Sequence, residues 1–585
     1  MTVRVTKLGL TIPQVSLLIV SVTALLALVL VAVPLRLPIG PNYWDVYLFL
    51  DVAHRIDLGQ VPHRDFFVPI GILPFYLHDV VQFLFPNAQP VLAVQYGILL
   101  LALPLALLTG LDIERRSRWL AGLVLAPFAI FALLPFNIIE FYPSPGIDGF
   151  GIYNRQAGLM LYLLVAALFL CSRHWLKFIV SAVVLLALLY IKVTAGLAAA
   201  CIIATAIVSG HFSLRGGALV LLSAVIATAG LEIATGLPRA YLADLAGLVE
   251  DNTDSLADRI LTFVSLKFDV LAAVAAFGLF VLWQDRNRLL RCLRYLLGKG
   301  PVASPERLLS LRWLAGHPVA VLAALTLMAT GYETQNTGSN EYIFLWPAVL
   351  LVWITIGVSI EGTYRVATMV LICAIALPTL SKVLHKAART AAVAPGYVRV
   401  ATGIEGPLAM TLAKPVHSER ANVLARHYAT ERESWLALAR NGQKPSAIQY
   451  SEPDYQTFYV RSIAEAAQGV LQLEALFGKR FESTHVLDFV DPLTPLLKRI
   501  PPRFVSVAMD PDRTFPVRIR QRVAQELAAV DALIIPRCPI TPARLGIEES
   551  AASELQGRQI IALSRCWDIA FKSNLPAVLA RQDVR

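Results

Sequence analysis

Long apolar runs divide this chain of 585 residues, and they restrict its fold more than any other feature. A helix needs about 20 apolar residues to cross the hydrocarbon core of a bilayer. Runs approaching this length lie at 13–35, 89–111, 118–136, 156–171, 176–191, 194–210, 216–236, 260–283, 318–331, 343–360 and 366–380. Only 16% of the residues are charged, against about 25% in soluble domains. We predict a polytopic α-helical membrane protein with about eleven transmembrane helices, the first of them an uncleaved span.

The distribution of Lys and Arg over the loops predicts which side each loop faces. Residues 66–86 are also apolar, but they contain Pro69, Pro74 and Asp79, so we expect this segment to lie at the membrane interface. The inner loops then hold 16 Lys and Arg, and the longer outer loops hold 7. Basic residues prefer the cytoplasmic side. The N-terminus is therefore expected in the cytoplasm and the C-terminal region on the outer side.

The composition changes near residue 380, which divides the chain into a transmembrane domain, 1–380, and a soluble domain, 381–585. In the second part, helical patterns alternate with short apolar runs such as HVLDFV, DALIIP and RQIIALS. This alternation indicates an α/β domain. Its two cysteines, Cys538 and Cys566, each follow a predicted strand. On the outer side they would form a disulfide, and the alternative is two separate buried thiols.

A charged stretch, NYWDVYLFLDVAHRIDLGQVPHRDFF, follows the first span on the outer side. Its first part predicts a surface helix over 45–58, with Asp45 as N-cap and Gly59 as the residue just past its end. Asp51 and Arg55 are one turn apart and can pair. Asp45 and Asp51 are therefore explained by capping and pairing alone. Alternatively, Asp45 is a carboxylate at the membrane boundary that takes a proton from a substrate hydroxyl or amine.

The order of these features resembles the N-terminal region of GT-C-fold glycosyltransferases, including lipid A aminoarabinose transferases and protein O-mannosyltransferases. The features are one span, Asp45 opening a surface helix, the motif Gly59-x-x-Pro62-x-x-Asp65-Phe66, and a Pro-broken segment ending FLFPNAQP. The resemblance implies two juxtamembrane helices, here at 45–58 and 72–85. It also implies that Asp45 is the catalytic base, and that the donor is a sugar linked to polyprenyl phosphate.

The chain departs from the family at two positions. Several relatives carry an acidic pair where this chain has Asp45-Val46, and many carry a Lys where it has FFVPIGILP. The donor-phosphate ligand and a divalent metal therefore stay open. His63, Arg64, Lys192 and Arg155 are the candidate phosphate ligands, because cations suit phosphate oxygens. Headgroup contact, snorkelling and helix anchoring are the structural alternatives.

Six further outer-side residues are candidates for binding the acceptor or the sugar: Asp51, Asp65, Asp148, Tyr153, Glu333 and Asn340. Asp148 and Tyr153 belong to PSPGIDGFGIYNRQ, and Glu333 and Asn340 to YETQNTGSNEY, the polar loops before and between spans. For the second loop a solvated turn is an equally good interpretation.

Several function classes lack their motifs in this sequence. It has no His-Glu-x-x-His, no Walker loop and no Gly-rich nucleotide fingerprint, and His417, His427 and His485 lack metal-ligand spacing. Nothing indicates a nucleic-acid partner. We expect an inverting glycosyltransferase of a bacterial inner membrane, with a periplasmic C-terminal domain, acting on a glycan or glycolipid acceptor. The alternatives are a polysaccharide ligase or polymerase, a lipid-linked-sugar flippase or transporter, and a scaffold.

Overall fold

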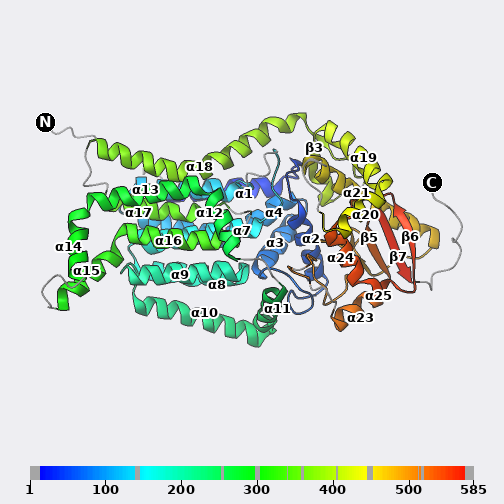
Figure 1. Cartoon of the computed structure of the whole chain (residues 1–585), viewed down its shortest axis with the longest axis horizontal. Helices are drawn as coiled ribbons and strands as arrows, with labels where there is room; N and C mark the ends of the chain where they lie inside the picture. Colours follow the sequence, from blue (N-terminus) through cyan, green and yellow to red (C-terminus); the bar gives the residue numbers. More distant parts are fainter. Residues whose placement is uncertain are drawn as a thin grey trace.

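The computed structural model describes residues 14–138, 145–251, 256–296, 304–336, 338, 340–356, 362–403, 406–443, 452–511, 513–515 and 520–572. Figure 1 shows a long bundle of helices joined at one end to a smaller domain of helices and a sheet. The segments that link these two parts contain the charged stretch after the first span.

Apolar helices occupy every position at which a span was predicted. Five are long enough to cross a membrane by length and composition, and three bent pairs raise the number to eight. The five are α1 (Val15–Ala32), α7 (Ile152–Leu170), α8 (His174–Ile191), α10 (Leu214–Thr235) and α18 (Thr363–Val393). The pairs are α4 (Pro90–Gly97) with α5 (Leu99–Glu114), α12 (Leu256–Leu266) with α13 (Phe268–Gln284), and α15 (Ser304–Gly316) with α16 (Pro318–Thr334). Shorter apolar helices are α6 (Arg118–Leu133), α9 (Val193–Val208), and η1 (Ile343–Leu345) continuing into α17 (Trp346–Ile356). A membrane-spanning bundle is supported, and the count of eleven stays a prediction.

Burial separates the helices inside the bundle from those on its outside. In the most apolar segment of α7, 94% of the residues are buried, whereas in that of α10 only 11% are buried. A helix that is apolar all round and packed on every side forms a bundle core. A mostly uncovered apolar helix such as α10 suits a lipid environment. Helix α14 (Arg286–Leu296), with its four arginines, lies at the end of the bundle remote from the α/β domain (Figure 1).

Three amphipathic helices lie where the bundle meets the α/β domain: α2 (Trp44–Asp57), α3 (Leu73–Leu84) and α11 (Leu237–Asp251). The first two occupy the places where juxtamembrane helices were predicted. Gly59, at φ +76°, ends α2 because its N–H and that of Gln60 reach back to the carbonyls of Ile56 and Arg55. The predicted N-cap is wrong. Helix α2 begins after Tyr43 without a side-chain cap, and Asp45 is its second residue.

The α/β domain is built on a four-stranded sheet in the order β4-β5-β7-β6. Its strands are β4 (Thr484–Val486), β5 (Ala532–Pro536), β6 (Arg558–Ser564) and β7 (Trp567–Lys572). β4 and β5 are parallel and the other pairs antiparallel. The helices are α19 (Pro415–Thr430), α20 (Arg432–Arg440), α21 (Glu452–Phe477), α22 (Leu493–Leu496), α23 (Gln521–Ala529), α24 (Pro542–Ser550) and α25 (Ala552–Leu555). A disulfide joins Cys538 to Cys566, as one of the two sequence interpretations expected.

The two parts are joined by main-chain hydrogen bonds as well as by side chains. A small sheet combines strands from both parts of the chain: β1 (Leu37–Pro38), β3 (Thr411–Ala413) and β2 (Val398–Arg399). The Phe67 N–H also donates to the Val505 carbonyl. The predicted boundary at 380 falls inside α18, which runs on to Val393. The polar C-terminal end of that helix did not reveal that the helix continues.

Candidate active site

Asp45 lies at the point where α2 meets the beginning of α7. Its Oδ2 accepts a hydrogen bond of 2.7 Å from the Gly151 N–H. Gly151, at φ +66°, is the residue that precedes α7. A helix N-terminus favours a negative charge, because its first N–H groups have no partner within the helix. Asp45 therefore binds the start of another helix instead of capping its own.

The glycine-rich loop before α7 is needed for this approach. A Cβ on Gly149 would lie 2.6 Å from the Cα of Tyr43, so only glycine lets the loop pass that close to the start of α2. The loop also pairs with the strand before α2, since the Gly40 N–H donates to the Ile147 carbonyl. The sequence GIDGFG thus positions the Gly151 N–H against Asp45.

Asp45 is only 6% exposed, and burial raises the pKa of its carboxyl to about 6. The Gly151 N–H and the positive charges of Arg155 and Lys192 oppose this rise in the pKa. In the part of the chain that the structure describes, the second carboxylate oxygen of Asp45 makes no hydrogen bond. A carboxylate with one fixed oxygen and one free oxygen, and a pKa near neutrality, can accept a proton.

Lys192 supplies a positive charge close to Asp45. It lies between α8 and α9, and its Nζ donates to the Gln335 carbonyl at 3.1 Å and to Asn154 Oδ1 at 3.4 Å. The Nζ also lies 5.4 Å from the ring centre of Tyr153. Burial lowers the pKa of Lys192 to about 8; the charge of Asp45 opposes this change, and that of Arg513 adds to it. Lys192 is thus a desolvated cation held mainly by neutral partners.

Polar side chains from the end of α16 surround this lysine. Arg259 of α12 donates to Gln335 Oε1 at 3.1 Å, and Thr194 Oγ1 donates to Asn336 Oδ1 at 3.2 Å. Glu333, which is 1% exposed, accepts a hydrogen bond from the Tyr342 N–H and interacts electrostatically with Lys192. The structure therefore brings Asp45, Tyr153, Lys192 and Glu333 into one region at this end of the bundle.

Arg155 and Asp148 stabilise the loop before α7 in the same region. Arg155 is fully buried, and it donates to Gln95 Oε1 and to the carbonyls of Asp148, Phe150 and Gly338. Its guanidinium therefore positions the loop before α7, and its hydrogen bonds are already used. Asp148 Oδ2 accepts from the Asn137 N–H at 2.8 Å and lies 3.4 Å from Lys386 Nζ.

Asp51 and Arg55 form the i,i+4 pair expected from the sequence. Arg55 Nε lies 3.0 Å from Asp51 Oδ1, and neither side chain is exposed. Arg55 also donates to Gln60 Oε1 and to the Pro502 carbonyl of the α/β domain. Burial raises the pKa of Asp51 to about 6, although the Arg55 charge opposes the rise. This pair connects α2 to the α/β domain.

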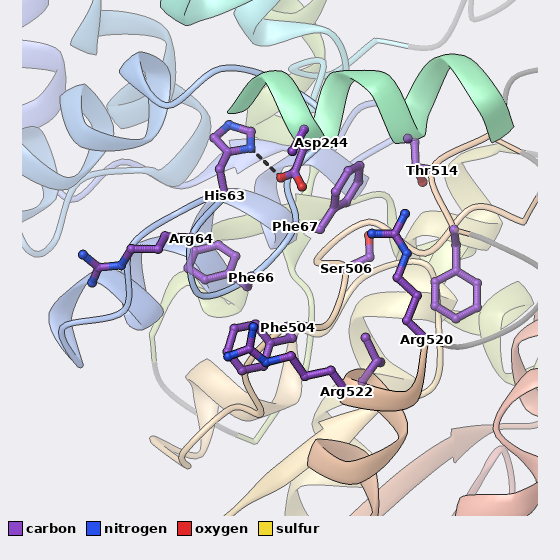
Figure 2. Close-up of a pocket in the computed structure, with 14 residues that line it drawn as sticks. His63, Arg64, Phe66, Phe67, Asp244, Phe504, Ser506, Thr514, Arg520 and Arg522 are labelled. Carbon is purple, nitrogen blue, oxygen red and sulfur yellow. Dashed lines mark hydrogen bonds and ion pairs between the residues drawn. The ribbon is translucent and has the colours of Figure 1, made fainter. Parts of the chain in front are cut away.

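His63, Arg64 and Asp65 line or border a separate cavity between the loop after α2, helix α11 and the α/β domain (Figure 2). His63 Nδ1 lies 2.7 Å from Asp244 Oδ2 of α11, and Arg64 pairs with Asp65 at 3.2 Å. In Figure 2, Arg64 points away from the arginines Arg520 and Arg522, which reach in from the α/β domain. Among the described residues, no hydrogen bond or ion pair joins His63 or Arg64 to Asp45 or Lys192.

Asn340 is buried at 1% exposure, and neither polar atom of its side chain has a hydrogen-bond partner in the described ranges. Sequence reasoning missed Arg513, whose charge acts on Lys192 from a loop of the α/β domain. It also missed α11, Arg520 and Arg522. No local pattern marks these residues, because only the docking of the α/β domain brings them to the bundle.

One cavity is lined in part by Trp44 and Phe150, the residues just before Asp45 and Gly151. Asp45 itself is not in its lining. Within the described residues, no group of three His, Cys, Asp or Glu side chains is placed to hold a metal ion.

Two structures of ArnT from Cupriavidus metallidurans are similar to this one. The form bound to undecaprenyl phosphate has a TM-score of 0.42 and 13% identity, over 96% of this chain and 99% of that chain. The apo form has a TM-score of 0.41 and 11% identity, over 94% of this chain and 97% of that chain. The oligosaccharyltransferase of Archaeoglobus fulgidus, in complex with Zn and sulfate, has a TM-score of 0.30 and 14% identity, over 88% of this chain and 67% of that chain.

No protein-family model matches the chain, and no curated protein matches its sequence.

Proposed function

We propose that the chain is a membrane glycosyltransferase that moves a sugar from a polyprenyl-phosphate donor to an acceptor hydroxyl. The observation that carries this proposal is a buried carboxylate, Asp45, held by the Gly151 N–H within the electrostatic influence of a desolvated cation, Lys192, at the end of an apolar helical bundle. A lipid-linked donor needs an apolar surface for its chain, a cation for its phosphate and a base for the acceptor. The donor class follows the family resemblance in the sequence.

Asp45 acts as the general base in this proposal. Its free oxygen takes the proton of the acceptor hydroxyl, and the acceptor oxygen forms a bond to the anomeric carbon. The bond between that carbon and the phosphate oxygen breaks, and polyprenyl phosphate leaves with the bonding electrons. Attack opposite the leaving group inverts the anomeric centre. The Gly151 N–H keeps the carboxylate in place during proton transfer.

Lys192, assisted by Arg513, stabilises the negative charge that grows on the leaving phosphate. Such stabilisation in a site with little water lowers the barrier by several kcal/mol. Arg155 is a positioning residue, because its donors are used by the loop before α7. Tyr153, Glu333 and Asn340 remain candidates for contacts to the sugar, since they lie at the same end of the bundle.

We place the enzyme in the inner membrane of a bacterium, with the N-terminus in the cytoplasm and the α/β domain in the periplasm. The Cys538–Cys566 disulfide supports an oxidising compartment for that domain. The position of basic helix α14 at the opposite end of the bundle supports the same orientation.

The test is sugar transfer by the purified full chain in proteoliposomes, with a panel of labelled sugars on undecaprenyl phosphate and a mixed glycan and glycolipid acceptor extract. We expect labelled acceptor and released undecaprenyl phosphate, and no transfer from a nucleotide-sugar. A product made of many donor units would identify the polymerase alternative. Movement of the intact donor between leaflets without transfer would identify the flippase alternative.

A further inference from the structure

A cavity of about 340 Å³ lies between the start of α2, the loop before α7 and helices α21 and α24 of the α/β domain. Its walls include Asn42, Trp44, Phe150, Tyr455, Asp510 and Thr541. A volume of this size accommodates one or two sugar rings. The cavity therefore opens where the membrane part and the α/β domain each contribute one side.

One side of this cavity is aromatic. The rings of Trp44 and Tyr455 are 5.8 Å apart, and Phe150 belongs to the lining as well. The C–H face of a pyranose is apolar and packs against such rings, because both surfaces lose unfavourable contact with water. An apolar lining with a few fixed polar groups is the usual composition of a small-ligand site.

Polar groups with hydrogen-bonding capacity lie beside the aromatic wall. Asn42 adopts φ +50°, and its main-chain N–H donates to Glu452 Oε1 at 3.0 Å, which fixes the backbone that carries its amide. Over the described ranges, the side-chain amide of Asn42 and the indole N–H of Trp44 have no hydrogen-bond partner. Asp510 and Thr541 add oxygen atoms that can accept from hydroxyls. This mixture of donors and acceptors matches the hydroxyls of a sugar.

The charge of the cavity argues against an anionic ligand. Among the described residues that line it, the cation is Arg544, which is 7% exposed and makes a two-point contact with Asp488, at 3.0 Å and 2.7 Å. Arg544 also donates to the Cys538 and Pro539 carbonyls, so its hydrogen bonds are used within the protein. The other carboxylate of the lining, Asp510, lies 3.3 Å from Arg513, so the described lining offers no unpaired cation to an anion. The cavity of Figure 2 is different, because Arg64, Arg520 and Arg522 make it basic.

The cavity is lined by the chain neighbours of the proposed base and of the glycine that holds it, although Asp45 itself is not in the lining. Trp44 immediately precedes Asp45, and Phe150 immediately precedes Gly151, whose N–H holds the Asp45 carboxylate. Asp510 pairs with Arg513 at 3.3 Å, and the charge of Arg513 in turn acts on Lys192. A ligand in this cavity therefore contacts the residues that adjoin both charged members of the candidate site.

We infer that this cavity is the acceptor subsite, and that it takes an uncharged sugar unit of a glycan rather than a phosphorylated lipid headgroup. The identification of the sugar as the acceptor rests on the proposed function. The prediction that the cavity binds a neutral sugar does not depend on catalysis. The aromatic wall seats the sugar ring, and the Asn42 amide, Trp44 indole and Asp510 bind its hydroxyls.

The experiment measures binding of the full chain, in lipid nanodiscs, to an array of neutral oligosaccharides and of phosphate-bearing oligosaccharides. Ala543, an exposed residue at the cavity edge on α24, is changed to Trp to fill the space. Glu549→Trp on the exposed opposite part of the same helix is the matched control. We expect neutral glycans to bind the wild type and Glu549→Trp equally, and Ala543→Trp at least ten-fold more weakly.

Preference of the wild type for phosphorylated glycans, absence of any neutral binder, or unchanged binding by Ala543→Trp would each overturn the inference. Equal thermal unfolding temperatures for the two variants establish that any loss is local. Neutral glycan binding without sugar transfer from any polyprenyl-phosphate donor contradicts the proposed function and leaves the subsite standing. Sugar transfer without neutral glycan binding supports the proposed function and overturns the inference about the subsite.

Discussion

Asp45 and Asp51 lie on the same helix, two turns apart, and differ in what surrounds them. Both are buried, and burial raises the pKa of each carboxyl to about 6. Asp51 has a guanidinium 3.0 Å away, which Arg55 also uses to hold the α/β domain. Asp45 has one main-chain N–H and, among the described residues, no ion-pair partner; in each of the two carboxylates the other oxygen makes no hydrogen bond there.

This difference separates a carboxylate that stabilises the structure from one that is available for chemistry. A buried charge with a close counter-ion is held in one geometry, and removing either partner leaves an uncompensated charge. A buried carboxylate without an ion-pair partner has a pKa raised toward neutral pH, which suits a group that exchanges a proton in a reaction. The following variants test the two roles against each other.

The largest effect is expected for Asp45→Asn. The amide keeps the shape and can still accept from the Gly151 N–H, but it cannot take a proton. We expect the rate of sugar transfer to fall about 100-fold or more, with an unchanged unfolding temperature. The matched control is Asp57→Asn, at the exposed end of the same helix, which should retain full activity. Full activity in Asp45→Asn would remove the assignment of the base.

Asp51→Ala should instead reduce stability. The free energy of unfolding is expected to fall by about 3–5 kcal/mol, because Arg55 is left buried without its counter-ion. Thermal unfolding in detergent measures the loss. The double variant Asp51→Ala/Arg55→Met should be less destabilised than the sum of the two single changes. Activity per folded molecule should stay within a few-fold of the wild type. An Asp51→Ala variant that is stable but inactive would contradict the structural role of Asp51 and make it the candidate for the catalytic role instead of Asp45.

Lys192→Met tests whether the cation beside Asp45 binds the donor. A hydrogen bond to a charged group contributes about 1.5–3 kcal/mol, so we expect the KM for the lipid-linked donor to rise about ten-fold or more. Lys479→Met, at an exposed position of the α/β domain, controls for the loss of one positive charge. An unchanged donor KM together with full turnover would leave Lys192 a purely structural role.

The smallest effect is the pH dependence of kcat/KM. Activity should rise as pH passes about 6, because Asp45 must lose its proton to act as a base. It should fall again as pH passes about 8, because Lys192 then loses its charge. Lys192→Arg should remove the fall at high pH and leave the rise at low pH in place. If an active Asp45 variant showed the same rise of kcat/KM near pH 6, the titrating group would not be Asp45.

The interface helices show how far local sequence carries a prediction. Helix α2 was placed from Asp45 and Gly59 as its ends, because such signals act within a few residues. The Pro-containing run at 66–86 indicated only a segment at the interface, and the helix at 72–85 came from the family resemblance. The N-cap role of Asp45 was wrong for the opposite reason. Its true partner, Gly151, is 106 residues away, and no spacing rule reaches that far.

The candidate cations divide in the same way. Lys192 was marked by its position between two apolar runs, and the structure brings it near Asp45. Arg155 looked equally suitable in the sequence, but the carbonyls of Phe150 and Asp148 use its hydrogen bonds. His63 is bound to Asp244 of α11, a helix that the sequence did not predict. Whether a cation is available depends on its partners, and those come from distant parts of the chain.

The sequence by itself determined that the chain forms an apolar helical bundle with juxtamembrane helices and an α/β domain. Hydrophobic burial and helix ends depend on residues close together in the chain. Only the tertiary structure decided which carboxylate is paired and which is free, and where the aromatic cavity beside Asp45 lies. Electrostatic interaction and burial act through space, so they depend on how α2, α7 and the α/β domain pack together.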